Sequence, residues 1–523
     1  MRAFGTFPSL QVSRNPLVTF LVFLLVIFLG YQAAEAILAN DLSSLVLAGM
    51  LLVAGAVVVA VLNDWRRGLY MLVAWILFED FVRKYLGNNM AIYFAKDLLA
   101  ILLYLSFYRA RPAERSEKSK IPFRVPLMVF FWFCLLQMFN PASPSIFYGI
   151  LGMKINFLYV PLIFVGYAFA ESEENVRRLL SFVCALILIV AALGLAQSII
   201  GPTFLNPTNL QEDIRDLSTV YRATPISGLL AYRPTSVFVS ASRFQDFLIF
   251  AWLISLGYSG YLILRSRQGR TLAFTTVGVV AAASLMSASR GVFMWNAGTT
   301  LLLTAGFLWG APWHQHEAIR AVRAIQRTCL IIGLGLVLLL TIFPKELGSR
   351  MAIYSETLMP GSPASELVKR TQTYPLQQLE LAFNHERWPY GYGMGTCALG
   401  GQYVVRIMKA DPIYIGVESG FGNLIVELGI LGLNLWIVLG LAIAISAYQV
   451  VAKLRGTPWF PLVFAIWLYV VVLVFPMMFT GNSAYEDFVL NSNLWLFLGL
   501  LYRMKSYPDA FEVAQAQVAS ERT

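Results

Sequence analysis

Long apolar runs alternate with short polar connections along almost the whole chain. Each run is about 20 residues long, and a helix of that length crosses a hydrocarbon core roughly 30 Å thick. Stretches such as 43–62 are apolar on every face, whereas the strands of a membrane barrel alternate. The pattern predicts an all-α fold, a polytopic membrane helix bundle of about 12–14 transmembrane helices. The candidate spans lie near residues 16–36, 42–62, 69–86, 91–109, 125–141, 154–170, 178–200, 244–264, 271–287, 291–310, 328–343, 421–449, 458–479 and 490–503.

Lys and Arg are concentrated in the connections that this threading places on one side of the membrane. Short basic loops normally face the cytoplasm, so we assign both chain ends to that side. The first apolar stretch follows Arg2 and Arg14 and is interpreted as an uncleaved span; the alternative is a signal peptide cut near Ala33–Ala36. The connections that define this orientation are 63–68, 109–124, 171–178, 265–270, 314–327 and 453–455.

The composition agrees with a lipid environment, since 58% of the residues are apolar and only 13% are charged. The formal charge of +10 sits mainly in the short loops, so it indicates topology, and no nucleic-acid partner is expected. Cys134, Cys184 and Cys329 fall in apolar runs and only Cys397 lies in a long polar segment. The cysteines therefore predict no disulfide framework.

Two longer polar segments fall on the side opposite the basic loops, residues 201–243 and 344–420. The second is rich in charge yet balanced, with seven basic and seven acidic residues. Within it, the segment 363–383 has leucines at roughly helical spacing, which predicts short amphipathic helices over the membrane-embedded part. We therefore expect the chemistry to take place in these outer segments.

Motifs that are missing narrow the chemistry. A nucleotide-sugar enzyme normally has a doubly wound domain and an ATP-driven machine has a phosphate-binding loop, and neither pattern is found in the sequence. The glycines of Gly391-Tyr-Gly393-Met-Gly395 are interpreted as a close-packed turn, because no strand–turn–helix pattern surrounds them. His314 and His316 lie in a basic loop without other metal ligands. Neither a metal nor a cofactor is expected.

Four motifs follow one another in the second half of the chain, all at the outer side of the predicted bundle. They are Arg233-Pro-Thr-Ser-Val-Phe238 with Arg243, Ser287-Ala-Ser289-Arg290-Gly291, Arg370 followed by Trp388-Pro-Tyr-Gly391-Tyr-Gly393-Met-Gly395, and Glu418-Ser-Gly-Phe-Gly-Asn-Leu-Ile-Val-Glu427-Leu-Gly429-Ile-Leu-Gly432. Together they resemble the O-antigen ligase and polymerase superfamily, over roughly residues 230–445. Each motif is weak alone, and the order of the four makes the resemblance specific.

The resemblance implies a metal-independent, inverting glycosyl transfer on the periplasmic face of a bacterial inner membrane. The donor would be a glycan on undecaprenyl pyrophosphate, and the acceptor a sugar hydroxyl on another lipid-linked glycan or on a lipid A core. A chain-length regulator, a flippase and membrane lipid are the further partners that it implies. The chain then divides into N-terminal transmembrane helices (1–230), a ligase-like catalytic region that includes the periplasmic loop 344–420 (231–450), and C-terminal transmembrane helices with a cytoplasmic tail (451–523).

A pyrophosphate leaving group develops negative charge, and without a metal it requires multidentate cations such as guanidinium groups. Arg290 is the strongest candidate, because it is predicted at membrane depth, where an Arg is costly; a snorkelling turn residue is the alternative. Arg370 is the second catalytic candidate and Arg233 a substrate-binding one, with pairing to a loop acid as the alternative for both. Arg243 joins the substrate-binding set, although a helix-face ion pair with Asp246 is the favoured alternative.

Where the family's ligases place a His-Asn pair before the entering helix, this chain has Glu418-Ser419. Glu418 is thus the candidate general base, with a pKa tuned by partial burial at the membrane mouth. The alternative is an acid that favours the positive end of a helix. The departure favours a polymerase over a ligase. His385 is the candidate to replace the missing histidine and joins Arg387 in the substrate-binding set, with a solvated loop residue as the alternative.

Charged residues inside the predicted spans have a structural interpretation. The clusters at 79–84 and 96–97 combine acids with Lys or Arg, which predicts a polar network that stabilises the bundle. A transporter of lipid or polysaccharide is the alternative from another class. For a transporter we expect paired broken helices and ionisable residues near mid-bilayer.

Overall fold

The computed structural model describes most of the chain. The described residues are 42–86, 90–110, 121–207, 221–265, 268–310, 323, 341–359, 362, 365–367, 369–398, 400–401, 404–405, 413, 415–481 and 484–507, with the backbone alone at 42–52, 90, 91 and 370. The predicted span 16–36, residues 328–340 of the predicted span 328–343, and the residues Cys329, His314 and His316 lie outside this set. The described part is mostly helical, as the apolar runs predict.

Six helices of the described part are long and apolar enough to cross a membrane. They are 146–169, which combines α6 (Ile146–Phe157) and α7 (Leu162–Phe169), α8 (Glu173–Ile200), α10 (Ala241–Arg265), α12 (Arg290–Gly310), α17 (Gly420–Lys453) and 460–480, which combines α18 (Phe460–Val472), η5 (Leu473–Met477) and α19 (Met478–Thr480). The largely helical fold is thereby confirmed, with helices that could span a membrane. The total number of spans stays a prediction.

Further helices occupy the other predicted spans within the described residues. They are α2 (Leu42–Asn63), α3 (Trp65–Tyr85), α4 (Met90–Arg109), α5 (Arg124–Gln137), α11 (Arg270–Met286) and α20 (Phe488–Met504). The chain divides into two compact units, residues 1–75 with 93–115 and residues 76–92 with 116–523. The candidate site residues all belong to the second unit. The three-part functional division of the chain stays a prediction.

The first unit contains α2, the start of α3 and most of α4. Gly68 lies where a Cβ atom would approach Val61 to 2.9 Å and Leu103 to 3.3 Å, which keeps these helices close. Lys96 is buried and donates to the carbonyl of Tyr93. The buried Lys96 and Asp97 agree with an internal polar role rather than a solvent-exposed one.

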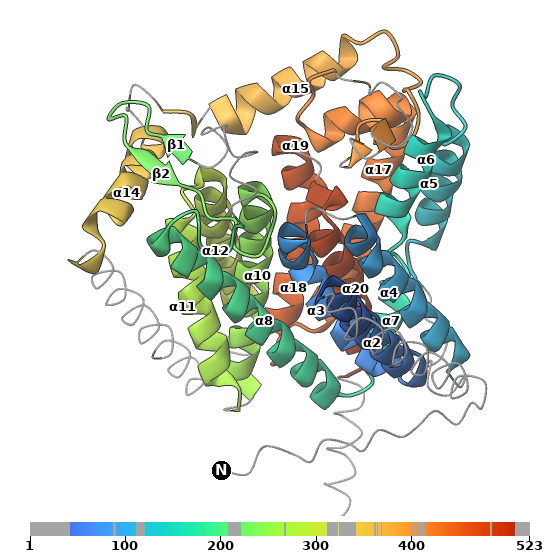
Figure 1. Cartoon of the computed structure of the whole chain (residues 1–523), viewed down its shortest axis with the longest axis horizontal. Coiled ribbons are helices and arrows are strands. Elements are labelled where there is room, and N and C mark those ends of the chain that lie inside the picture. The colour runs from blue at the N-terminus through green and yellow to red at the C-terminus, as the bar shows by residue number, and fades with distance from the viewer. Residues whose placement is uncertain are drawn as a thin grey trace, which may run out of the picture. The chain divides into compact units, whose positions relative to one another are not determined.

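In the second unit, α10 packs against α11, α12 and α18, while α20 packs against α7 and α17 packs against α5 (Figure 1). The contact between α7 and α20 depends on two glycines. A Cβ atom on Gly166 would lie 2.3 Å from the carbonyl oxygen of Leu496, and one on Gly499 would lie 2.2 Å from that of Ile163. Small residues let membrane helices approach closely, so packing substitutes for the hydrophobic effect that lipid does not supply.

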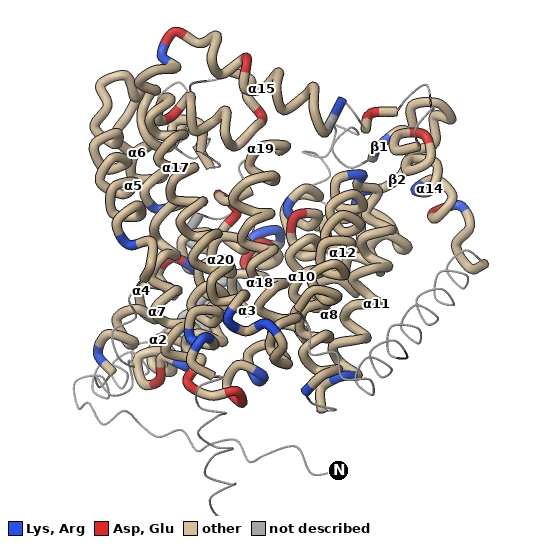
Figure 2. Tube along the Cα trace, turned by 180° about the vertical axis from the view of Figure 1, so that it is seen from behind, with Lys and Arg blue, Asp and Glu red and all other residues tan. Residues whose placement is uncertain are grey.

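The connections of the second unit that are predicted to be cytoplasmic lie together at one end. Arg265 Nε donates to Glu173 Oε1 at 3.1 Å, and the Gly456 amide donates to the Gly310 carbonyl at 2.8 Å. Figure 2 shows Lys and Arg at this end of α8 and α11, and α15 (Tyr374–Phe383) at the other end of the unit. This grouping agrees with the prediction that the basic connections share one end of the helices and the longer polar segments the other. Which end faces the cytoplasm stays a prediction.

A short antiparallel hairpin at the α15 end departs from the all-α prediction. Strand β1 (Tyr221–Ala223) pairs with β2 (Leu230–Tyr232), and a turn with Gly228 at φ 65° joins them. Only three residues pair on each strand, which is too short for a recognisable alternating pattern. The helices α14 (Pro344–Leu358) and α15 fall within the predicted outer loop 344–420, where short helices are expected.

Helix α17 is broken at Gly429, whose φ of 69° and ψ of −175° are not helical. The carbonyl of Pro389 would lie 2.3 Å from a Cβ atom on Gly429, and the Ile430 amide donates to the Trp388 carbonyl at 3.1 Å. The segment around residues 388–391 therefore supplies the hydrogen bond that the break frees. Non-helical backbone at membrane depth is tolerated where protein satisfies it in this way.

Candidate functional site

Arg233 and Arg290 lie near each other at the α15 end of the second unit. Arg233 follows β2 directly, and Arg290 is the first residue of α12 after a turn in which Ala288 has φ 52°. Burial, and after it the charge of Arg290, lowers the pKa of Arg233. Two guanidinium groups close enough to repel each other are costly, and a bound anion offsets that repulsion.

Arg290 also has a carboxylate partner. Its Nη1 atom lies 2.5 Å from Glu366 Oε2, and its side chain is 12% exposed. The sequence alone does not assign a role to Glu366, because it lies 76 positions from Arg290. A guanidinium that binds one carboxylate in this geometry is built to bind an oxyanion of similar shape.

Three buried donor atoms, one on Arg233 and two on side chains of α10, have no hydrogen-bond acceptor among the described residues. They are Arg233 Nε, Arg243 Nη2 and Gln245 Nε2. Arg233 Nη2 donates to Gln245 Oε1 at 3.4 Å. Two of the three unsatisfied atoms, Arg233 Nε and Gln245 Nε2, are therefore on side chains that contact each other. A buried donor without an acceptor costs about 1–3 kcal/mol, and an anionic ligand removes that cost.

Arg243 forms ion pairs between helices and not with Asp246. Its Nε lies 2.7 Å from Asp487 Oδ2, and its Nη1 contacts Asp80 Oδ2. Arg83 pairs with Asp80 at 2.6 Å. The expected pair with Asp246 on the same helix is wrong, because Arg243 meets two carboxylates from other segments.

Lys84 extends this network to the loop before α10. Its Nζ donates to Thr235 Oγ1 at 3.0 Å and to the Ser236 carbonyl at 2.9 Å. The residues Glu79, Asp80, Arg83 and Lys84 are all buried. The cluster at 79–84 is therefore the internal polar network that the sequence predicts, and Arg243 belongs to it.

Glu418 lies one residue before the N-cap of α17. The Ser419 hydroxyl accepts the Gly422 amide at 3.1 Å, so Ser419 is the cap and Glu418 stands just outside the helix. The Tyr374 hydroxyl donates to Glu418 Oε2, and the Glu418 amide donates to Gln378 Oε1 at 2.6 Å. The side chain is exposed, so the expected partial burial is wrong. Tyr374 of α15 orients the carboxylate, which remains exposed, and Gln378 of α15 holds the Glu418 backbone.

His385 lies in the turn after α15, with both ring nitrogens engaged. Nδ1 accepts the Arg387 amide at 3.1 Å and Nε2 lies 2.5 Å from the Tyr392 hydroxyl. Burial is the main cause that lowers the pKa of His385, and Arg387 adds to it while Glu386 opposes it. The Arg387 side chain is exposed and stacks over the Tyr392 ring. A histidine in this arrangement has no free lone pair for an acceptor hydroxyl.

Arg370 belongs to η4 (Lys369–Thr373), which runs directly into α15. Its side chain lies outside the described residues. The backbone places it between Glu366, which contacts Arg290, and Tyr374, which contacts Glu418. This short segment thus links the two groups of candidate residues.

Glu427, in the fourth motif, holds the glycine-rich turn 391–395. Its carboxylate accepts the Gly395 amide at 3.1 Å and the Cys397 amide at 2.8 Å. It is 4% exposed and stands two residues before the break in α17. The glycine cluster is thus the close-packed turn that we expected, held by a carboxylate. Spacing alone did not reveal the contact, since 32 positions separate Glu427 from Gly395.

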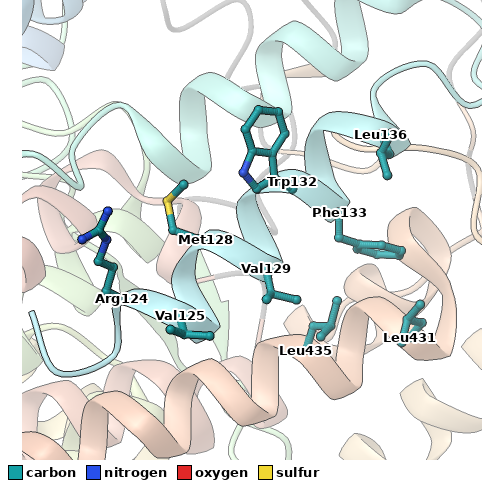
Figure 3. Close-up of a pocket in the computed structure, with 9 residues that line it drawn as sticks. All are labelled: Arg124, Val125, Met128, Val129, Trp132, Phe133, Leu136, Leu431 and Leu435. Atoms are coloured by element: carbon teal, nitrogen blue, oxygen red, sulfur yellow. The ribbon is translucent and has the colours of Figure 1, made fainter.

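An apolar groove of about 570 Å³ lies between α5 and α17 (Figure 3). Val125, Val129 and Phe133 face Leu431 and Leu435 across it, and Arg124 stands at one end. Figure 1 places α5 on the opposite side of the second unit from α12 and α14. The groove is suited to a hydrocarbon chain. It is separate from the pair of arginines Arg233 and Arg290, which we call the arginine cluster.

No model of a known protein family matches the chain, and no curated protein matches it. Among the described residues, no cluster of His, Cys, Asp and Glu is arranged to hold a metal ion. The resemblance to the O-antigen ligase and polymerase superfamily therefore depends on the four sequence motifs alone.

Proposed function

We propose that this protein is a membrane glycosyltransferase that polymerises oligosaccharide repeat units carried on undecaprenyl pyrophosphate. The observation that supports it best is the proximity of Arg233 and Arg290, with unsatisfied buried donors beside them. These guanidinium groups would bind the donor's diphosphate. The product would be a surface or exported polysaccharide made on the periplasmic side of the inner membrane.

The chemistry requires one base and one stabilised leaving group. The acceptor hydroxyl oxygen attacks the anomeric carbon of the donor sugar, and its proton passes to the Glu418 carboxylate. The bond between that carbon and the phosphate oxygen breaks, and its electron pair remains on the pyrophosphate. Arg290 and Arg233 stabilise the charge that develops there, and Arg370 is proposed to contribute from η4.

The acceptor side of the site is proposed to lie around α15. Tyr374 and Gln378 hold Glu418, and the exposed rings of Trp388 and Tyr390 follow in the next turn. Flat aromatic side chains stack on sugar rings, so these two are the proposed sugar platform. Arg387 would bind acceptor hydroxyls, and His385, whose ring nitrogens are both engaged, would hold Tyr392 rather than take the proton.

Reconstitution tests this proposal directly. The purified protein in proteoliposomes is given a pooled set of undecaprenyl-pyrophosphate-linked oligosaccharides, and glycan length is measured by gel and mass spectrometry. Longer glycans on the lipid, together with released undecaprenyl pyrophosphate, are expected. A ligase would instead require added lipid A core or protein as acceptor. Unchanged glycans under every acceptor condition would reject both activities.

A specific observation favours transport as the second candidate. Helix α17 is broken at Gly429, η5 contains Pro476, and the charged trio Asp80, Arg243 and Asp487 lies between helices. Broken helices and intramembrane charges are typical of transporters. Movement of an unaltered lipid-linked glycan across proteoliposomes, with no change in its length, would support transport instead.

A further inference from the structure

Arg350 is an almost fully buried arginine of α14, with 2% of its surface exposed. In the sequence, Arg350 is one of the seven basic residues of segment 344–420, and no motif includes it. Its Nε donates to the Met286 carbonyl at 2.8 Å, and its Nη2 donates to the Tyr232 and Ser198 carbonyls, each at 3.2 Å. Its Nη1 donates to the Glu346 carbonyl, one turn earlier in α14, at 2.5 Å.

Three of these carbonyls come from the ends of other elements. Met286 is the last residue of α11, Ser198 lies in the last turn of α8, and Tyr232 ends β2. Carbonyls in the last turn of a helix have no partner within the helix and carry partial negative charge. A buried guanidinium satisfies several of them together, because its five N–H donors point in fixed directions.

The residues next to these carbonyls are the proposed diphosphate ligands. Arg233 follows Tyr232 directly, and Arg290 follows Met286 after three residues. Packing adds to the hydrogen bonds, since Ile353 and Tyr354 of α14 form a buried cluster with Ala231 and Ala288. The Tyr354 hydroxyl also donates to the Leu285 carbonyl at 2.9 Å.

We infer that Arg350 is a positioning residue that sets the spacing of Arg233 and Arg290 and thereby the affinity for a diphosphate. The inference rests on the proposed function for the identity of the ligand. Arg350 itself is enclosed by backbone carbonyls and does not contact the ligand. Its role is to fix two segments, more than 50 positions apart in sequence, at one distance.

The matched test compares Arg350 with Lys345, an exposed cation on the first turn of the same helix. Arg350→Lys, Arg350→Met and Lys345→Met are purified in nanodiscs, and amide hydrogen exchange is followed over the whole chain. Both Arg350 variants are expected to exchange faster in residues 221–235 and 282–292, and the increase should be smaller for Arg350→Lys than for Arg350→Met. Lys345→Met is expected to exchange as the wild type does. Peptides from α18 serve as the internal control for global unfolding.

Farnesyl diphosphate is the ligand probe in a parallel binding titration. For reacting groups, a misplacement of about 1 Å costs on the order of 10²-fold in rate, which we take as the upper limit for the loss of affinity. We therefore expect affinity to fall roughly 10-fold to 100-fold in Arg350→Lys, with KM for the donor raised and kcat largely kept. Lys345→Met should bind as the wild type does.

The two arms separate this inference from the proposed function. Unchanged exchange at 221–235 and 282–292 in both Arg350 variants overturns the positioning role, as does faster exchange with full affinity for farnesyl diphosphate. Faster exchange in a protein whose wild type binds no diphosphate supports the positional role and overturns the proposed function. If Arg350→Met does not fold, the Lys variant decides the question alone.

Discussion

Arg290 of α12 and Glu366, just before η4, form an ion pair with 2.5 Å between Nη1 and Oε2. Under the proposed function, the carboxylate would occupy the place of a donor phosphate and compete with it for the Arg290 guanidinium. It also connects the arginine cluster to the segment that continues into α15 and holds Glu418. If a ligand displaces Glu366 from Arg290, the segment that carries Tyr374, and with it the proposed base Glu418, is expected to respond.

Removing the charge of Glu366 should strengthen diphosphate binding. In Glu366→Gln the neutral amide competes less well for Arg290, so KM for the donor should fall roughly 3-fold to 10-fold. Glu380→Gln, an exposed acid on α15, is the control and should leave KM unchanged. A higher KM in Glu366→Gln would mean that the pair builds the site instead of blocking it.

Arg290→Lys should cripple turnover while the protein stays folded. The ammonium keeps the charge but loses the planar fork, so a loss on the order of 10²–10³ in rate is expected. Arg178→Lys, at the basic end of α8, is the control and should retain full activity. Near-normal polymer from Arg290→Lys, at equal expression, would refute the diphosphate assignment.

Glu418→Gln tests the proposed base. The amide keeps the size and the hydrogen bond from Tyr374 but cannot accept a proton, so turnover should fall on the order of 10²–10⁴. Tyr374→Phe removes only the orienting bond and should lose less, about 10-fold. If Glu418→Gln keeps most of its rate while His385→Ala abolishes it, the catalytic role passes to His385.

The stability of the turn after α15 should depend on pH through His385. Its pKa is lowered in the folded protein, so the unfolded chain binds the proton more strongly. The contribution is then fully present above the unfolded value of about 6.5 and is lost as the pH falls through the lowered folded value. Amide protection factors at 385–392, which correct for the slower intrinsic exchange at low pH, should be smaller at pH 5 than at pH 7.5. His385→Gln should show a smaller difference, and an equal one would exclude His385 as the cause.

Cysteine labelling tests the orientation. In a background without native cysteines, Tyr390→Cys should react with an impermeant reagent in intact spheroplasts, because Tyr390 is 76% exposed and lies in the outer loop. Arg178→Cys should react only after permeabilisation, since it lies near the start of α8, in the basic segment that is predicted to face the cytoplasm. The reverse labelling pattern would show that the threading is inverted.

The sequence by itself determined the helices and their alternation. Length and continuous hydrophobicity act locally, so the described helices α8, α10, α12, α17 and 460–480 coincide with the predicted spans to within a few residues at most ends. The sequence also indicated that the charges at 79–84 are internal, because lipid leaves a charged residue few other places to lie.

Tertiary structure alone decided which charges meet. Arg243 pairs with Asp80 and Asp487 at separations of 163 and 244 positions, and its nearer acid Asp246 is not its partner. Spacing on one helix predicts neighbours on that helix, but the choice between them and a carboxylate of another helix depends on packing. The same holds for Glu366 at Arg290. The four carbonyls around Arg350 are further out of reach of sequence, since every residue has a carbonyl and only the fold selects which ones converge.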